Sequence, residues 1–83
     1  MEKKEIFELI ARHTRSVIPM LENHTFQPED KFEDIGAYSL DRAEIFEMVM
    51  TSLSLDIPRI ELYGAKDIGA LVDLLYEAVN VNT

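Results

Sequence analysis

Residues 34–53 read DIGAYSLDRAEIFEMVMTSL and contain a turn followed by a helical apolar period, the pattern from which the fold is predicted. Gly36 gives the chain the freedom to turn just before Ser39. After the turn, apolar residues recur every three or four positions, a period that predicts an amphipathic α-helix beginning near Ser39. The apolar stripe of this predicted helix is Leu40, Ala43, Phe46, Val49, Met50 and Leu53.

Two more apolar stripes with helical spacing flank this segment. Pro19 is expected to end the first helix close to Ile18, because proline disrupts a helix interior. Asp67 stands at the beginning of the last helix. No useful length alternates with period two, so strands are not expected. The first stripe is Ile6, Leu9, Ile10, His13, Val17 and Leu21, and the last is Ile68, Leu71, Val72, Leu75 and Val79.

The connections between the three stripes differ in length. Residues 23–38 form a long loop, within which Asp30 and Glu33 have the spacing of a capping box and predict one helical turn. Aromatic and aliphatic residues are expected to pin this loop to the core. Residues 54–66 contain a brief apolar piece between Pro58 and Gly64, which predicts a short helix. The expected pins are Phe26, Phe32 and Ile35.

Together these patterns predict an all-α fold: a four-helix bundle with three long helices and one short third helix. At 83 residues, the chain is expected to form one domain over residues 1–83. The side chains predicted to pack its core are Ile6, Ile10, Val17, Phe46, Val49, Leu53, Ile60, Leu71 and Leu75.

The charge is strongly acidic, with 16 acids, 8 bases and a formal net charge of −8. Residues 22–56 hold nine of the acids and two of the bases, so nearly all of the imbalance lies there. Such a surface disfavours nucleic acid and anionic membranes as partners. It is either a solvated face that aids solubility or an electrostatic footprint for basic partners. No apolar stretch has the length of a signal peptide or a membrane span, so we expect a cytoplasmic protein. We also expect it to be a monomer.

Metal and disulfide chemistry have little support in the sequence. There is no cysteine, and His13 and His24 lie far apart, so no metal site is expected. Ser39 has no nearby histidine and no Gly-x-Ser-x-Gly elbow, and no triad or phosphate loop occurs elsewhere. We therefore expect no catalytic residues and a non-catalytic protein.

Ser39 at the predicted helix start has two interpretations. A serine oxygen there commonly caps a free backbone N–H group. A helix start also exposes unpaired N–H groups and the positive end of the dipole, which favour a phosphate ester on the hydroxyl. Since the chain offers no base to activate Ser39, another enzyme would have to supply the catalysis.

The run Gly36-Ala37-Tyr38-Ser39-Leu40-Asp41, followed by an acidic helix, resembles the acyl carrier protein motif, usually written Asp-Ser-Leu. The resemblance implies a 4′-phosphopantetheine on Ser39, derived from coenzyme A by a phosphopantetheinyl transferase. Its terminal thiol would carry acyl groups as thioesters. Asp41, Glu44 and Glu47 then match the family's acidic recognition helix. Tyr38 departs from the usual aspartate, which bears on the choice of transferase.

A narrower resemblance covers residues 39–45, 53–62 and 64–73, which are similar to the free-standing donor acyl carrier proteins of polyketide β-branching cassettes. It implies an acetyl group that a hydroxymethylglutaryl-CoA synthase-like enzyme condenses with a β-ketoacyl chain on a second carrier. An acyltransferase and a decarboxylating ketosynthase are the other implied partners. The expected partner-recognition residues are Tyr38, Leu40, Asp41, Arg42, Glu44, Glu47, Arg59 and Tyr63.

Several alternatives stay open at this point. Arg42 either pairs with a neighbouring acid of its own helix (Asp41, Glu44 or Glu47) or contacts the phosphate of the arm or a partner. Tyr63 is either a core residue or lines a slot for the acyl group. The chain could also be a general extender carrier of fatty acid or polyketide synthesis, a peptidyl or aminoacyl carrier, or an unmodified helical interaction module.

Overall fold

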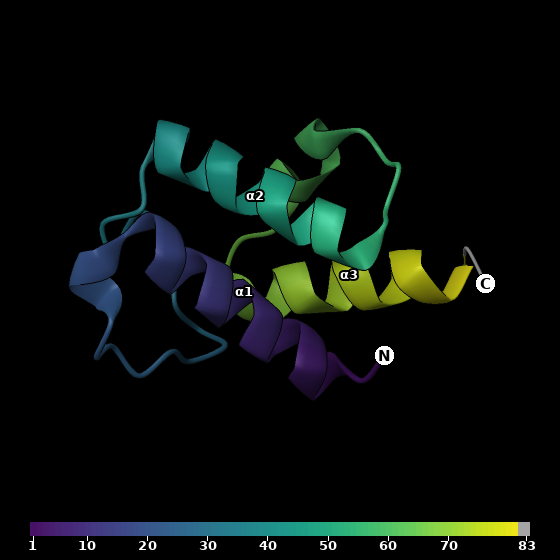
Figure 1. The fold of residues 1–83 in the computed structure, drawn as a ribbon. Helices are drawn as coiled ribbons and strands as arrows, with labels where there is room; N and C mark the ends of the chain where they lie inside the picture. The colour runs from purple at the N-terminus through teal and green to yellow at the C-terminus, as the bar shows by residue number, and fades with distance from the viewer. Residues whose placement is uncertain (82–83) are drawn as a thin grey trace.

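The computed structural model describes residues 1–81, and every element in that range is helical (Figure 1). Three long α-helices and the short η2 confirm the predicted all-α four-helix bundle. The element η1, which is one turn of 3-10 helix, was not predicted. In chain order the elements are α1 (Lys3–Val17), η1 (Pro19–Leu21), α2 (Ser39–Leu53), η2 (Arg59–Gly64) and α3 (Ile68–Val81).

Helix α1 begins and ends where its sequence indicates. The amide of Glu2 donates to the carboxylate of Glu5 at 2.8 Å, which satisfies a backbone donor at the helix start. The helix ends at Val17, and Pro19 opens η1 immediately afterwards, as predicted from the proline. Helix α1 packs against both α2 and α3, so it joins the two halves of the bundle.

The core confirms most of the predicted set and corrects one member. Ile60 is 77 % exposed, so its predicted burial was wrong. The buried residue of η2 is Leu62, and a separation of two positions places Ile60 on a different side of this short helix. Leu40, the first residue of the apolar stripe of α2, is 87 % exposed and lies roughly 180° around the helix from the buried Val49. Ile45, omitted from the predicted stripe, is fully buried, and Val17 and Leu53 are half-buried.

The long loop between η1 and α2 is packed and hydrogen-bonded. Phe26 and Phe32 are buried and Ile35 is half-buried, which confirms that these residues pin the loop. The carbonyl of Asp30 accepts a hydrogen bond from Ile68 N at 2.9 Å. The carbonyl of Pro28 accepts one from Gly69 N at 2.8 Å, and the loop is therefore fastened to the first turn of α3.

The close approach of the loop to α3 depends on a glycine. A Cβ at position 69 would lie 3.2 Å from both the Cβ and the carbonyl oxygen of Pro28. Asp67 completes the turn, since its Oδ1 accepts from Ala70 N at 2.8 Å. The amides that open α3 are thus all paired within the protein, and the predicted role of Asp67 at the helix start is confirmed.

Candidate functional site

Helix α2 begins at Ser39, as predicted, but Ser39 does not cap it. Tyr38 occupies the N-cap position with extended backbone (φ −95°, ψ −170°), and its side chain makes no capping hydrogen bond. Its carbonyl accepts the first helical hydrogen bond, from Arg42 N at 2.8 Å. Within residues 1–81 the Ser39 hydroxyl makes no hydrogen bond, so the capping interpretation was wrong. The hydroxyl is exposed and available for modification.

The backbone amides at this helix start are also unpaired. Ser39 N, Leu40 N and Asp41 N have no acceptor in the part of the chain that the structure describes. The start of α3, by contrast, has its amides paired with the long loop and Asp67. Three free N–H groups beside an exposed hydroxyl can donate hydrogen bonds to a phosphate oxygen.

A fixed turn holds Ser39 in place. Gly36 has φ +93°, a backbone conformation that residues with a side chain rarely adopt. The requirement for glycine is conformational, since no atom would lie within 4 Å of a Cβ at this position. Ala37 is fully buried and donates from its amide to the Phe32 carbonyl at 2.8 Å. The chain is thus anchored in the core only two residues before Ser39, whose own side chain faces solvent.

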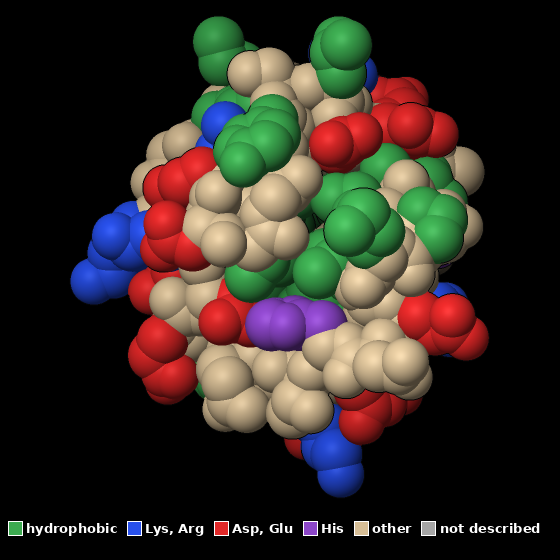
Figure 2. Space-filling view, turned by 90° about the vertical axis from the view of Figure 1, so that its left-hand side faces the viewer, with side chains coloured by type: hydrophobic (Ala, Val, Ile, Leu, Met, Phe, Trp, Pro, Cys, Tyr) green, Lys and Arg blue, Asp and Glu red, His purple; other side chains and the backbone are tan. Residues whose placement is uncertain are grey.

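The surroundings of Ser39 are apolar at the centre and acidic at the edges. Tyr38 is 64 % exposed and Leu40 projects outward on the other side of the serine. Figure 2 looks onto this end of the molecule and shows hydrophobic side chains at the surface between groups of acidic ones. Glu44 and Glu47 are exposed along α2, while Asp41 is half-buried. The face therefore suits a partner with basic residues around an apolar contact.

Arg42 pairs with none of the acids predicted for it. Its Nη1 lies 3.9 Å from the Oε2 of Glu33, which belongs to the long loop. Its guanidinium carbon also lies 5.4 Å from the centroid of the Tyr63 ring. In the sequence, Glu33 was related only to Asp30, since no local spacing rule relates a loop residue to a helix residue nine positions later. Arg42 therefore links the loop, α2 and η2.

The short helix η2 is tied to α2 at both of its ends. Arg59 Nη1 lies 3.3 Å from Glu47 Oε2 in an exposed ion pair. The Tyr63 ring meets Phe46 edge-on, with 5.0 Å between centroids, and stays 39 % exposed. Tyr63 therefore lies at the edge of the core, with one part of its ring against Phe46 and another part exposed to solvent. Among the predicted recognition residues, the structure brings together two pairs across α2 and η2, Glu47 with Arg59 and Arg42 with Tyr63.

Asp30 organises the loop that leads to this surface, although not as a capping box. Its Oδ2 accepts from Gln27 N at 2.9 Å and lies 2.9 Å from His24 Nε2, so the predicted link to Glu33 was wrong. One turn still forms, with Ile35 N donating to the Lys31 carbonyl at 3.2 Å. Burial would raise the pKa of Asp30, but the Gln27 hydrogen bond and the neighbouring His24 outweigh it and lower the pKa.

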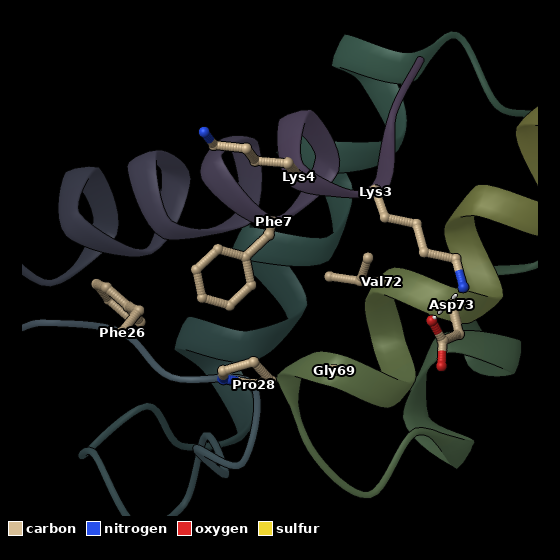
Figure 3. Close-up of a pocket in the computed structure, with 8 residues that line it drawn as sticks. All are labelled: Lys3, Lys4, Phe7, Phe26, Pro28, Gly69, Val72 and Asp73. Carbon is tan, nitrogen blue, oxygen red and sulfur yellow. Dashed lines mark ion pairs between the residues drawn. The ribbon is translucent and has the colours of Figure 1, made fainter.

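A groove of about 480 Å³ lies elsewhere, between α1, the loop and α3 (Figure 3). Phe7, Phe26, Pro28 and Val72 give it apolar walls, and Lys3 reaches across to Asp73 at 3.0 Å. None of its lining residues belongs to α2 or η2. Within residues 1–81 no three histidine or acidic side chains are grouped to hold a metal ion, and none of the helices there could span a membrane.

Comparisons with known proteins identify similar chains. A scan against protein-family models found no match. The chain is 51 % identical over 79 residues to the polyketide biosynthesis acyl-carrier-protein AcpK of Bacillus subtilis (strain 168), which covers 95 % of this chain and 96 % of that protein. Among solved structures, the crystal structure of the curacin biosynthetic pathway HMG synthase in complex with acetyl donor-ACP matches with a TM-score of 0.86 and 48 % identity. That match covers 90 % of this chain and 96 % of the matched one.

The role of Asp30 yields a prediction about acid stability. Its carboxyl has a pKa lowered from the ordinary 3.8, so the folded state binds its proton less readily than the unfolded state. The ionised Asp30 carboxylate therefore stabilises the folded state fully at pH values above 3.8. This stabilisation is lost as the pH falls through the lowered pKa of the folded state. Asp30→Asn should reduce the free energy of unfolding at pH 7 by about 1–3 kcal/mol, because a charged acceptor is lost.

Chemical denaturation between pH 7 and pH 2 measures both effects. Asp30→Asn should show a shallower loss of stability in acid than the natural protein. Asp34→Asn is the matched control, since Asp34 is exposed and its side chain makes no hydrogen bond or ion pair within residues 1–81. An equal flattening of the acid limb in both variants would contradict the role assigned to Asp30.

Proposed function

This chain belongs to the acyl carrier protein family, and from that premise we propose that Ser39 carries a 4′-phosphopantetheine arm. The exposed hydroxyl, the unpaired amides of Ser39, Leu40 and Asp41, and the anchored Gly36 turn support the assignment. When bound, the arm supplies a terminal thiol that holds an acyl group as a thioester. The protein's own residues present that arm and take no part in bond making beyond the serine oxygen.

The helix start fits the phosphodiester of such an arm. The ester keeps a negative charge, which the positive end of the α2 dipole and the three free N–H groups stabilise. In the transfer, Ser39 Oγ bonds to the pantetheine-bearing phosphorus of coenzyme A, the hydroxyl proton leaves, and 3′,5′-ADP departs. Within residues 1–81 no side chain forms a hydrogen bond with the Ser39 hydroxyl, so the transferase supplies the proton acceptor.

The carried group is proposed to be acetyl, and the acceptor a hydroxymethylglutaryl-CoA synthase-like enzyme of polyketide β-branching. The single observation that carries this proposal is the 48 % identity, over 90 % of the chain, to an acetyl donor-ACP crystallised with such a synthase. The resemblance of residues 64–73, which form the η2–α3 junction and the first part of α3, supports it independently of the serine motif. An acyltransferase and a decarboxylating ketosynthase would load and process the unit beforehand.

The acidic face of α2 is proposed to guide this encounter. A donor must bind, release its acetyl group and leave, so a fast and weak association is favourable. Long-range attraction between the −8 chain and basic partners raises the on-rate without requiring a large buried interface. Glu44 is exposed and forms no ion pair within residues 1–81, whereas Glu47 is occupied by Arg59. Glu44 is therefore the more available charge for a partner.

The attachment site is tested by mass spectrometry. Incubation with coenzyme A, magnesium and a broad-specificity phosphopantetheinyl transferase should add one phosphopantetheine to the natural protein and none to Ser39→Ala. Ser54→Ala is the matched control, because Ser54 is also exposed beside α2, at its other end, and should leave the modification unchanged. Modification of the Ser39→Ala variant would exclude Ser39 as the site.

The donor role is tested by acetyl transfer to a hydroxymethylglutaryl-CoA synthase-like enzyme. Protein first loaded with acetyl-phosphopantetheine and checked by intact mass should acetylate the synthase. Glu44→Lys should slow the transfer roughly tenfold at low salt and much less at high salt, since screening removes long-range attraction. The folded stability should change by no more than about 0.5 kcal/mol, because the residue is exposed.

Glu77→Lys serves as the charge-matched control. It makes the same change of net charge at an exposed position on α3 and should transfer acetyl nearly as fast as the natural protein. Equal slowing by both substitutions would mean that net charge alone governs the encounter. An ordinary extender carrier that acetylates the synthase equally well would leave the general carrier role and remove the dedicated donor role.

A further inference from the structure

Three aromatic rings form a continuous row from the long loop through α2 to η2. Phe32 meets Phe46 edge-on at 5.7 Å between centroids, and Phe46 meets Tyr63 in the same manner at 5.0 Å. Phe32 and Phe46 are buried, whereas Tyr63 is only partly covered. Tyr63 is therefore the outermost ring and closes the seam between α2 and η2 from the solvent side.

Polar contacts hold that ring in position. The Arg42 guanidinium lies over Tyr63, and Arg42 Nη1 lies 3.9 Å from Glu33 Oε2. At the opposite end of η2, Arg59 pairs with Glu47, and between the two ends Leu62 is fully buried. A cation over an aromatic face and an ion pair each contribute modestly at a surface. Because these two contacts act at opposite ends of η2, together they hold η2 against α2.

The seam lies next to the attachment site. Ser39 and Arg42 are three positions apart on α2 and therefore lie on neighbouring parts of one helix side. An arm that leaves Ser39 on this side first meets Arg42 and the exposed edge of Tyr63. A long acyl chain gains free energy when its methylenes leave water, provided that the carrier has apolar space for them. At this seam three aromatic rings are in contact with one another, and the outermost, Tyr63, is 39 % exposed.

We infer that Tyr63 is a specificity-determining residue that seals the α2–η2 seam, so that acyl groups on the Ser39 arm stay in solvent and the carrier favours short ones such as acetyl. The inference rests on the proposed arm at Ser39 and adds a chain-length limit to it. A small thioester that remains outside is also directly accessible to the enzyme that removes it. A longer chain receives no burial that would compensate for its exposure to water.

Thermal unfolding of acyl-loaded protein tests the seal. A broad-specificity transferase is used to attach acetyl-, hexanoyl- and decanoyl-phosphopantetheine from the matching acyl-coenzyme A, and intact mass confirms each product. The three forms of the natural protein should unfold within about 1 °C of one another. In Tyr63→Ala the vacated seam should admit the chain, and the decanoyl form should melt about 5 °C or more above the acetyl form.

Three further variants isolate the ring. Tyr63→Phe keeps the ring, so its melting temperature should not depend on chain length. Tyr63→Leu removes the ring but keeps an apolar side chain, and its melting temperature should rise with chain length less than that of Tyr63→Ala. Tyr63→Leu also serves as the test variant if Tyr63→Ala folds poorly. Tyr76→Ala removes a half-buried tyrosine from α3, beside Lys3, and should show none. A melting temperature that rises with chain length in the natural protein, or that stays flat in both Tyr63→Ala and Tyr63→Leu, would overturn the inference. If none of the three acyl-phosphopantetheine groups can be attached to the natural protein, the proposed arm at Ser39 is itself wrong.

Discussion

Two backbone hydrogen bonds, from Ile68 N and Gly69 N to the carbonyls of Asp30 and Pro28, hold the long loop against the first turn of α3. The absence of a side chain at Gly69 permits this approach. With its middle fixed there, the loop continues through buried Phe32 to buried Ala37 and arrives at Ser39 along a determined path. A loop of this length without such anchoring would leave the serine in many positions.

The same contacts make the helix starts chemically different. The first amides of α3 are used to hold the loop, and α1 begins with a bond from Glu2 to Glu5. The start of α2 has neither a loop nor a capping side chain over it, so its amides face solvent beside the serine hydroxyl. Unpaired donors at an exposed helix end can be hydrated, but an anion fixed there replaces water with charge-assisted bonds. The site is thus a helix start that the protein leaves uncapped.

The sequence predicted most of this fold because helical periodicity and proline act locally. The three long helices, the end of α1 before Pro19 and the loop pins Phe26 and Phe32 follow from such signals. Leu40 was included in the apolar stripe because a spacing of three drifts around a 3.6-residue helix. Ile60 was placed in the core because the apolar content of a short helix does not show which of its residues faces inward. The Arg42–Glu33 pair and the Asp30–Gln27 contact depend on tertiary packing and loop geometry, which periodicity does not encode. Ser39 was located by the motif, whereas its freedom from capping required the structure.

We propose that the free amides at the start of α2 bind the phosphate of an arm on Ser39. Backbone ¹H–¹⁵N spectra of the protein before and after enzymatic transfer of 4′-phosphopantetheine, with complete transfer verified by mass, measure this binding. The amide resonances of Ser39, Leu40 and Asp41 should shift most, in the direction of stronger hydrogen bonding, while those of Ile68, Gly69 and Ala70 stay in place because they are already bonded. Unchanged resonances at the start of α2 in fully modified protein would show that the phosphate does not bind there.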